Sequence, residues 1–213
     1  MQTNKEKLSY SIGLETGKNL KSQFADMDVK FLIEGFEDGI THASPKLPQD
    51  EIRSLLTALH KQVEQQQKEF VTKIAEQQKK QGETFLAENK NKEGVVTLPS
   101  GLQYKVLKEG KGPHPKLVDT VLVHYKGEFI DGRVFDSSSE RGKPHHFTVN
   151  QVIPGWSEAL QLMNVEAKWR LFVPSYLAYG ERGFQREIPP NTTLIFEMEL
   201  LAINPQGDSH STP

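Results

Sequence analysis

The chain has 213 residues, with 26 Lys and Arg against 28 Asp and Glu, which gives a formal net charge of −2. This balance excludes the broad basic face that nucleic-acid binding needs. Cysteine is absent, which excludes disulfides, zinc–thiolate sites and thiol catalysis. No apolar run approaches the ~20 residues of a membrane span. We therefore expect one large domain or two small ones, not spanning a membrane and not binding nucleic acid.

Residues 1–92 follow a helical period. Apolar and small residues recur at three- and four-residue steps and form one stripe: Tyr10, Leu14, Gly17, Leu20 and Phe24. A second stripe follows, with Asp26 or Asp28 as its N-cap: Val29, Leu32, Ile33, Phe36 and Ile40. The two stripes predict two amphipathic helices within a helical domain over residues 1–47.

A third helix is predicted to begin at Pro48, where Gln49, Asp50 and Glu51 suit a helix N-terminus. Its apolar stripe thins after Val63 into a run of Gln, Lys and Glu. A helix over residues 48–92 would be roughly 60 Å long at 1.5 Å per residue, with Gly82 as its weak point and as a place where it could bend. A disordered, charged linker is the alternative for the second part of this segment.

Two short helices cannot cover the apolar stripe of the third, so self-association is expected. Gly13 and Gly17 lie four residues apart and would let a second helix approach closely. We predict a homodimer through residues 5–65, with the first part of the long helix in its core. The alternative is that the stripes pack only within one chain.

Residues 95–204 turn to a strand pattern. Four segments predict strands: SGLQYKVLKEG, TVLVHYKGEFIDGRVFD (two strands joined by a two-residue turn at Asp131–Gly132), KWRLFVP and TLIFEMELLAI. One short helix is predicted to begin at Pro154–Trp156. The fold class is therefore α+β: a helical N-terminal region followed by a bent antiparallel sheet wrapped on one α-helix. Residues 205–213 are predicted to be a flexible tail.

Several aromatic and branched residues lie near the expected ends of these strands and could face one space above the short helix. They are Tyr125, Phe135, Phe147, Val152, Ile153, Trp156, Tyr179, Ile188 and Phe196. Composition and periodicity alone do not separate an apolar cleft from an ordinary core at these positions.

The order of four motifs resembles the FKBP-type peptidyl-prolyl cis–trans isomerases. The motifs are VHYKGEFIDGRVFDSS, QVIPGWSEALQLM, VPSYLAYGERG and IPPNTTLIFEMELL. The helical half, with LSYSIGLETGKNLKSQF and FLIEGFEDGI, is similar to the Mip and FkpA group of bacterial FKBPs. The resemblance implies an N-terminal dimerisation domain, a long helix that holds two isomerase domains apart, and an FKBP domain over residues 95–204.

The resemblance implies that Trp156 is the floor beneath the substrate's proline ring. It places Tyr125, Phe135, Phe147 and Phe196 on the walls, Val152 and Ile153 on the loop before the helix, and Ile188 on a flap. Asp136 and Tyr179 are the polar residues on which activity would depend. For Asp136, an electrostatic role and a structural role both stay open.

The chain departs from the family pattern at a few positions. Glu166 stands where the family commonly has a turn glycine, so the turn must tolerate a side chain. Phe184, Arg186 and Glu187 stand in the variable flap, from which substrate preference cannot be derived. His145 and His146 are adjacent on a predicted strand and therefore face opposite sides, so we expect no shared metal, and the family needs no cofactor.

The implied partners are proline-containing peptides, unfolded proteins and macrolides such as rapamycin and tacrolimus. A chaperone or host-interaction module with little catalysis is the alternative function. The start MQTNKEKLSY has no apolar signal-peptide core. Because the resembling group is generally exported, we expect a removed signal and a place in the periplasm or on the outer surface of a Gram-negative bacterium, with the cytoplasm as the alternative.

Overall fold

The computed structural model describes residues 3–24, 26–185 and 187–205, so the predicted tail lies almost wholly outside the described residues. Two compact units divide the chain, residues 1–64 and 65–213. Among the described residues, no helix combines the length and the apolar character that crossing a bilayer requires.

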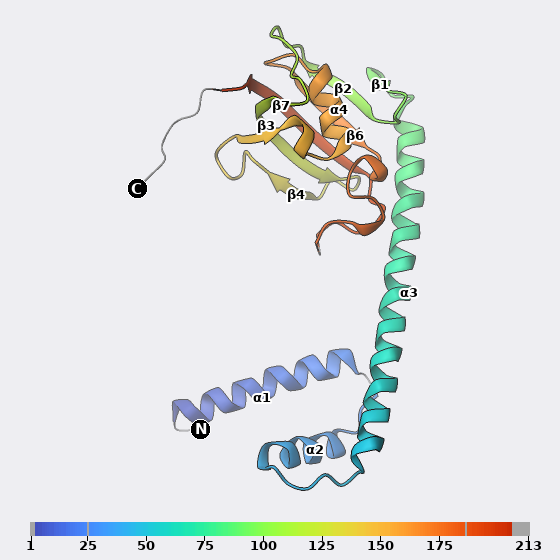
Figure 1. The fold of residues 1–213 in the computed structure, drawn as a ribbon, viewed down its shortest axis with the longest axis vertical. Coiled ribbons are helices and arrows are strands. Elements are labelled where there is room, and N and C mark those ends of the chain that lie inside the picture. Colours follow the sequence, from blue (N-terminus) through green and yellow to red (C-terminus); the bar gives the residue numbers. More distant parts are fainter. Residues whose placement is uncertain (1–2, 25, 186, 206–213) are drawn as a thin grey trace. The chain divides into compact units, whose positions relative to one another are not determined.

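The first unit contains α1 (Asn4–Gln23), α2 (Val29–Thr41) and the beginning of α3 (Gln49–Asn89) (Figure 1). Thr3 and Glu6 form a capping box at the start of α1, and Asp28 caps α2 through its side chain, which settles the choice between Asp26 and Asp28. Neither α1 nor α2 has a buried residue among those described. Both predicted helices therefore exist, with their apolar stripes uncovered in the single chain.

Helix α3 is continuous for 41 residues, so the alternative of a disordered linker is wrong. Gly82, which the sequence marks as a weak point, is not a break in this helix. A Cβ at Gly82 would lie 2.2 Å from Thr193 Oγ1 and 3.0 Å from Thr193 Cβ. The glycine therefore permits a close approach between α3 and the loop before β7.

The last turns of α3 pack against the sheet of the second unit. The rings of Phe85 and Phe172 lie 5.9 Å apart. The buried Asn89 donates from Nδ2 to Gln103 Oε1 at 2.9 Å, and Gln103 Nε2 donates to the Leu86 carbonyl at 2.9 Å. A buried amide pair with its partners satisfied stabilises this contact. The predicted domain ranges, 1–47, 48–92 and 95–204, stay a prediction, but these contacts attach the end of the helix to the sheet of the second unit.

The second unit is a seven-stranded antiparallel sheet in the order β1-β2-β6-β7-β3-β4, with β5 also paired to β3. The strands are β1 (Val95–Thr97), β2 (Gln103–Lys108), β3 (Thr120–Phe129), β4 (Val134–Ser137), β5 (His145–Thr148), β6 (Lys168–Val173) and β7 (Leu194–Ile203). Helix α4 (Pro154–Leu162) lies across one face of the sheet (Figure 1). Short 3-10 turns cover Val149–Gln151, Ser175–Leu177 and Gly180–Arg182.

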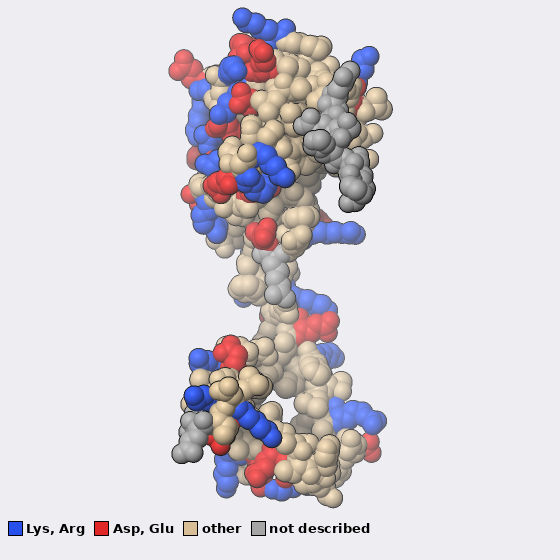
Figure 2. Space-filling view, turned by 90° about the vertical axis from the view of Figure 1, so that its left-hand side faces the viewer, with Lys and Arg blue, Asp and Glu red and all other residues tan. Residues whose placement is uncertain are grey.

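The strands separate an apolar face from a charged face. On β7, Leu194, Phe196, Met198 and Leu200 are buried, which confirms the predicted alternation. On the other face, Glu128 of β3 forms an ion pair with Arg170 of β6, and Glu197 of β7 forms one with Lys168 of β6. Figure 2 shows acidic and basic side chains intermingled over this part of the chain, without a large field of one sign.

Two details of the sheet differ from prediction. Strand β1 was not expected, because a segment of three residues carries little periodic signal, whereas β5 contains His145 and His146, which were expected on a strand. In the connection between β3 and β4, three residues separate Phe129 from Arg133, whose carbonyl accepts from the Phe129 N–H, and Gly132 has φ 87°. This is a three-residue turn with a G1 bulge. The pair Asp131–Gly132 therefore predicted the position of the hairpin correctly, but the loop is one residue longer than predicted.

Candidate functional site: an aromatic cluster around Trp156

Trp156 lies at the start of α4, where Pro154 occupies the first helical position. It is 5% exposed, and three rings meet it edge-on. The centroid distances are 5.0 Å to Tyr125, 5.5 Å to Phe147 and 5.1 Å to Phe196. Edge-to-face contacts of this kind are favourable beyond the area that they bury. The cluster therefore holds the indole in one orientation.

The cluster comes from separate elements whose pairing brings it together. Tyr125 lies on β3, Phe135 on β4, Phe147 on β5 and Phe196 on β7. Phe135 contacts Phe196 at 5.7 Å and lies over Gly127, where a Cβ would come within 2.5 Å of its ring. Val152, Ile153 and Tyr179 pack against the same core, in which Ile188 is buried. Nine of the ten predicted site residues thus belong to one hydrophobic core or pack against it, and Asp136 is joined to this core through Tyr125.

Asp136 lies in a network of hydrogen bonds at the edge of the cluster. Its Oδ2 accepts from the Tyr125 hydroxyl at 2.6 Å, its Oδ1 accepts from Arg141, and Arg141 Nη2 also donates to the Tyr125 oxygen at 2.7 Å. Partial burial raises the pKa of Asp136, but the bonds from Tyr125 and Arg141 outweigh it, so the pKa is lowered overall. The carboxylate is therefore ionised at neutral pH.

Two donors near the cluster have no acceptor within the described part of the chain. The Tyr179 hydroxyl makes no hydrogen bond to a described residue, and its ring stacks on that of Phe184, with the centroids 4.8 Å apart. Burial and then the charge of Asp136 raise the pKa of Tyr179, which keeps the hydroxyl protonated. The Ile153 backbone N–H precedes the first turn of α4 and is likewise unused, while the Ile153 carbonyl accepts from Trp156 and Ser157. Both groups are available to a ligand.

Family models and relatives agree on one assignment. The model described as FKBP-type peptidyl-prolyl cis-trans isomerase matches residues 111–201, and that of the domain amino-terminal to it matches residues 5–106. Outer membrane protein MIP of Legionella longbeachae is 46% identical over 95% of this chain and 87% of that protein. The FKBP-type 22 kDa peptidyl-prolyl cis-trans isomerase of Escherichia coli is 43% identical over 92% of this chain and 93% of that protein.

The chain belongs to the FKBP-type peptidyl-prolyl cis–trans isomerases. The crystal structure of FkpA from Escherichia coli matches the fold with a TM-score of 0.77 at 36% identity, over 97% of this chain and 100% of that one. The predicted family, fold class and enzymatic activity are therefore confirmed.

Two residues of this FKBP site were missed by sequence reasoning. Arg141 lies in the loop between β4 and β5, and its Nε donates to His145 Nε2 at 3.2 Å. The His145 ring in turn lies 6.2 Å from that of Tyr125. A loop has no periodicity to reveal such contacts. The available signal was the spacing of Arg141, which follows Asp136 of β4 by five residues.

The structure shows how the chain accommodates most of its departures from the family pattern. Glu166 has φ 70°, and its N–H donates to the Leu200 carbonyl at 2.7 Å, so this turn does hold a side chain in the left-handed region. In the flap, Phe184 and Ile188 exchange backbone hydrogen bonds, whereas Arg186 lies outside the described residues. His145 faces Tyr125 and His146 is exposed.

Proposed function

We propose that this isomerase binds the proline of an Xaa–Pro bond over the Trp156 indole. The observation that carries the proposal is the edge-on contact of three rings with a buried tryptophan at a helix start. The indole Nε1–H is a buried donor with no partner among the described residues. An unpaired buried donor costs about 1–3 kcal/mol, so the ring is held for its flat apolar surface.

Catalysis follows from the different polarity of the planar and the twisted amide. The rotation barrier of about 18–20 kcal/mol arises because resonance must be broken. The planar amide is more dipolar than the twisted one, so water stabilises the ground state more. An apolar site that excludes water favours the twisted amide by difference, and this is what acceleration requires. The mechanism needs no covalent step.

Each polar group then has a distinct part in the proposal. The Tyr179 hydroxyl and the Ile153 N–H donate to substrate carbonyls while the bond rotates. Asp136 acts as a positioning residue, because both of its oxygens are engaged by Tyr125 and Arg141. Its charge also helps to keep Tyr179 protonated. Six side chains exclude water around the substrate's proline ring: Tyr125, Phe135, Phe147, Phe196, Val152 and Ile188.

The roles are tested by measuring kcat/KM and rapamycin affinity on the same variants. Tyr179→Phe should lower kcat/KM while the protein melts as the wild type does. If Asp136 positions Tyr125, Asp136→Asn should weaken activity and rapamycin binding together. Lowered activity with intact rapamycin binding would instead show that the carboxylate acts electrostatically, and would overturn the positioning role.

We further propose a homodimer that holds client proteins with two isomerase sites. The support is the exposed apolar stripe of α2 in the first unit, with Ile33 61%, Phe36 55% and Ile40 65% exposed. Two linked weak sites raise avidity for a long chain that contains several prolines. Sedimentation should give twice the chain mass, and a monomeric variant should lose suppression of client aggregation while it keeps activity on short peptides.

We propose that the protein acts in the periplasm or at the outer surface of a Gram-negative bacterium. The support is its likeness to a relative named as an outer membrane protein. Fractionation of the source cells tests this proposal. Recovery in the cytoplasmic fraction alone would contradict it.

A further inference from the structure

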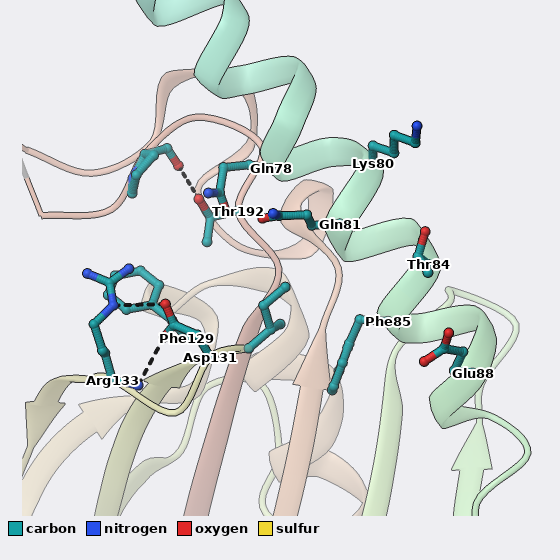
Figure 3. A pocket seen from close by; sticks show the side chains of 12 residues that line it. Gln78, Lys80, Gln81, Thr84, Phe85, Glu88, Phe129, Asp131, Arg133 and Thr192 are labelled. Atoms are coloured by element: carbon teal, nitrogen blue, oxygen red, sulfur yellow. Dashed lines mark hydrogen bonds and ion pairs between the residues drawn. The ribbon is translucent and has the colours of Figure 1, made fainter.

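A groove of about 570 Å³ lies within the second unit, outside the aromatic cluster. One wall is the end of α3, and the other is formed by the β3–β4 turn and the loop before β7 (Figure 3). In Figure 3 the side chains of Gln78 and Gln81 project from the helix toward Thr192. The groove therefore exists only because α3 packs on the isomerase fold.

The chemistry of the groove fits an uncharged stretch of polypeptide. Phe85, Phe129 and Pro189 supply apolar surface, and Gln78 and Gln81 supply amides that can both donate to and accept from a peptide backbone.

The charges of the groove are balanced. Lys80 and Arg133 stand against Glu88 and Asp131, and Arg133 Nε is bonded to Asp131 at 2.8 Å. A phosphate or a nucleic acid would require an excess of positive charge, so this lining disfavours both.

A series of ring contacts connects the groove to the proline site. Phe129, in the groove, lies 5.1 Å from Phe135, which lies 5.7 Å from Phe196, which lies 5.1 Å from Trp156. The flap residue Ile188 is followed directly by Pro189 of the groove lining. Trp156 and Phe196 are 5% and 3% exposed, so the series runs through the core and measures how close the groove lies to the indole.

We propose that this groove binds the client chain a few residues away from its isomerised proline. The inference rests on the proposed proline site over Trp156 and extends it. A strand rises about 3.3 Å per residue, so about five residues of extended chain cover the ring series from Trp156 to Phe129. A tetrapeptide is too short to reach the groove, whereas a peptide of about ten residues reaches it.

The first test compares isomerisation of a tetrapeptide with that of peptides of about ten residues, extended with uncharged residues on either side of the same Phe–Pro pair. With the full chain, one extension should lower KM several-fold and leave kcat nearly unchanged. Equal KM for all three peptides would overturn the groove. Absence of activity on the tetrapeptide would instead contradict the proposed proline site. Failure of the groove and failure of the proline site therefore give different results.

The second test blocks the groove after folding. Because the chain has no cysteine, Gln81→Cys can be labelled with a bulky maleimide at one position. Gln67→Cys is the matched control, since both residues are exposed on α3 and only Gln81 lines the groove. Labelling at position 81 should abolish the KM advantage of the extended peptide without changing tetrapeptide kcat/KM. An advantage that survives labelling at position 81, or is lost equally at position 67, would contradict the proposal.

Discussion

The two units of this chain use apolar residues in opposite ways. Every buried apolar residue of the described chain lies at or after Leu102, whereas α1 and α2 expose theirs, with Leu8 at 64% and Phe36 at 55%. The sheet of the second unit can fold over its own helix α4, whereas α1 and α2 of the first unit have no buried residue within the described part of the chain. The difference teaches that the apolar periodicity of a segment predicts whether a helix or strand forms, but not which surface buries its apolar side.

The largest expected effect comes from placing the same charge in the two units. Leu171→Glu, at a fully buried position, should cost more than about 4 kcal/mol, unfold the second unit and abolish activity. Leu14→Glu, at a position that is 45% exposed, should leave helicity and tetrapeptide activity intact but shift the proposed dimer to monomer. Circular dichroism, sedimentation and the peptide assay check the pair. Unfolding of both units by Leu14→Glu would break the comparison.

Replacing a helical glycine by alanine should also have opposite effects in the two units, with smaller changes in the free energy of unfolding. Gly82→Ala should lower the free energy of unfolding by about 1–3 kcal/mol, because its Cβ would overlap Thr193. Gly13→Ala, with no atom within 4 Å of the added Cβ, should raise the helicity of α1 in the monomer, since alanine is favoured by about 1 kcal/mol. Denaturant melts measure both changes. Partial recovery in Gly82→Ala with Thr193→Ala would identify the overlap as the cause.

The Asp136 network predicts an acid-dependent loss of stability confined to the second unit. Because the folded-state pKa of Asp136 is lowered, its contribution is present above the unfolded-state pKa and is lost as pH falls through the folded one. The side chain is 37% exposed, so the effect should be about 1 kcal/mol or less. Melts of wild type and Asp136→Asn should differ at pH 6, and the difference should shrink as the pH falls below about 4, through the lowered folded-state pKa of Asp136. A difference that persists at low pH would assign it to packing instead.

The smallest expected effect is at Glu166. Glycine there would relieve the left-handed backbone at φ 70° but would gain entropy in the unfolded chain, so Glu166→Gly should stabilise by no more than about 1 kcal/mol. Thermal melts of the second unit check this. Destabilisation would mean that the Glu166 side chain makes a contribution larger than the strain of its turn.

Much of the fold could be predicted because long elements repeat their pattern. The alternation in β7 and the helical stripes each span several periods, so they survive local exceptions. The family motifs then identified Trp156 and its neighbours. The packing of Gly82 on Thr193 could not be predicted, because a glycine in a helix carries no information about its distant partner. Arg141 was missed for a similar reason, since its contacts depend on the path of a loop.

The most direct test of the account is the cis-to-trans rate of a short Xaa–Phe–Pro–Xaa peptide, measured with the full chain and repeated with rapamycin. We expect acceleration that rapamycin abolishes, which would place the chemistry over Trp156. Absence of acceleration by a folded, dimeric protein would contradict the account and leave client holding as its function. Acceleration that rapamycin leaves unchanged would place catalysis outside the aromatic cluster.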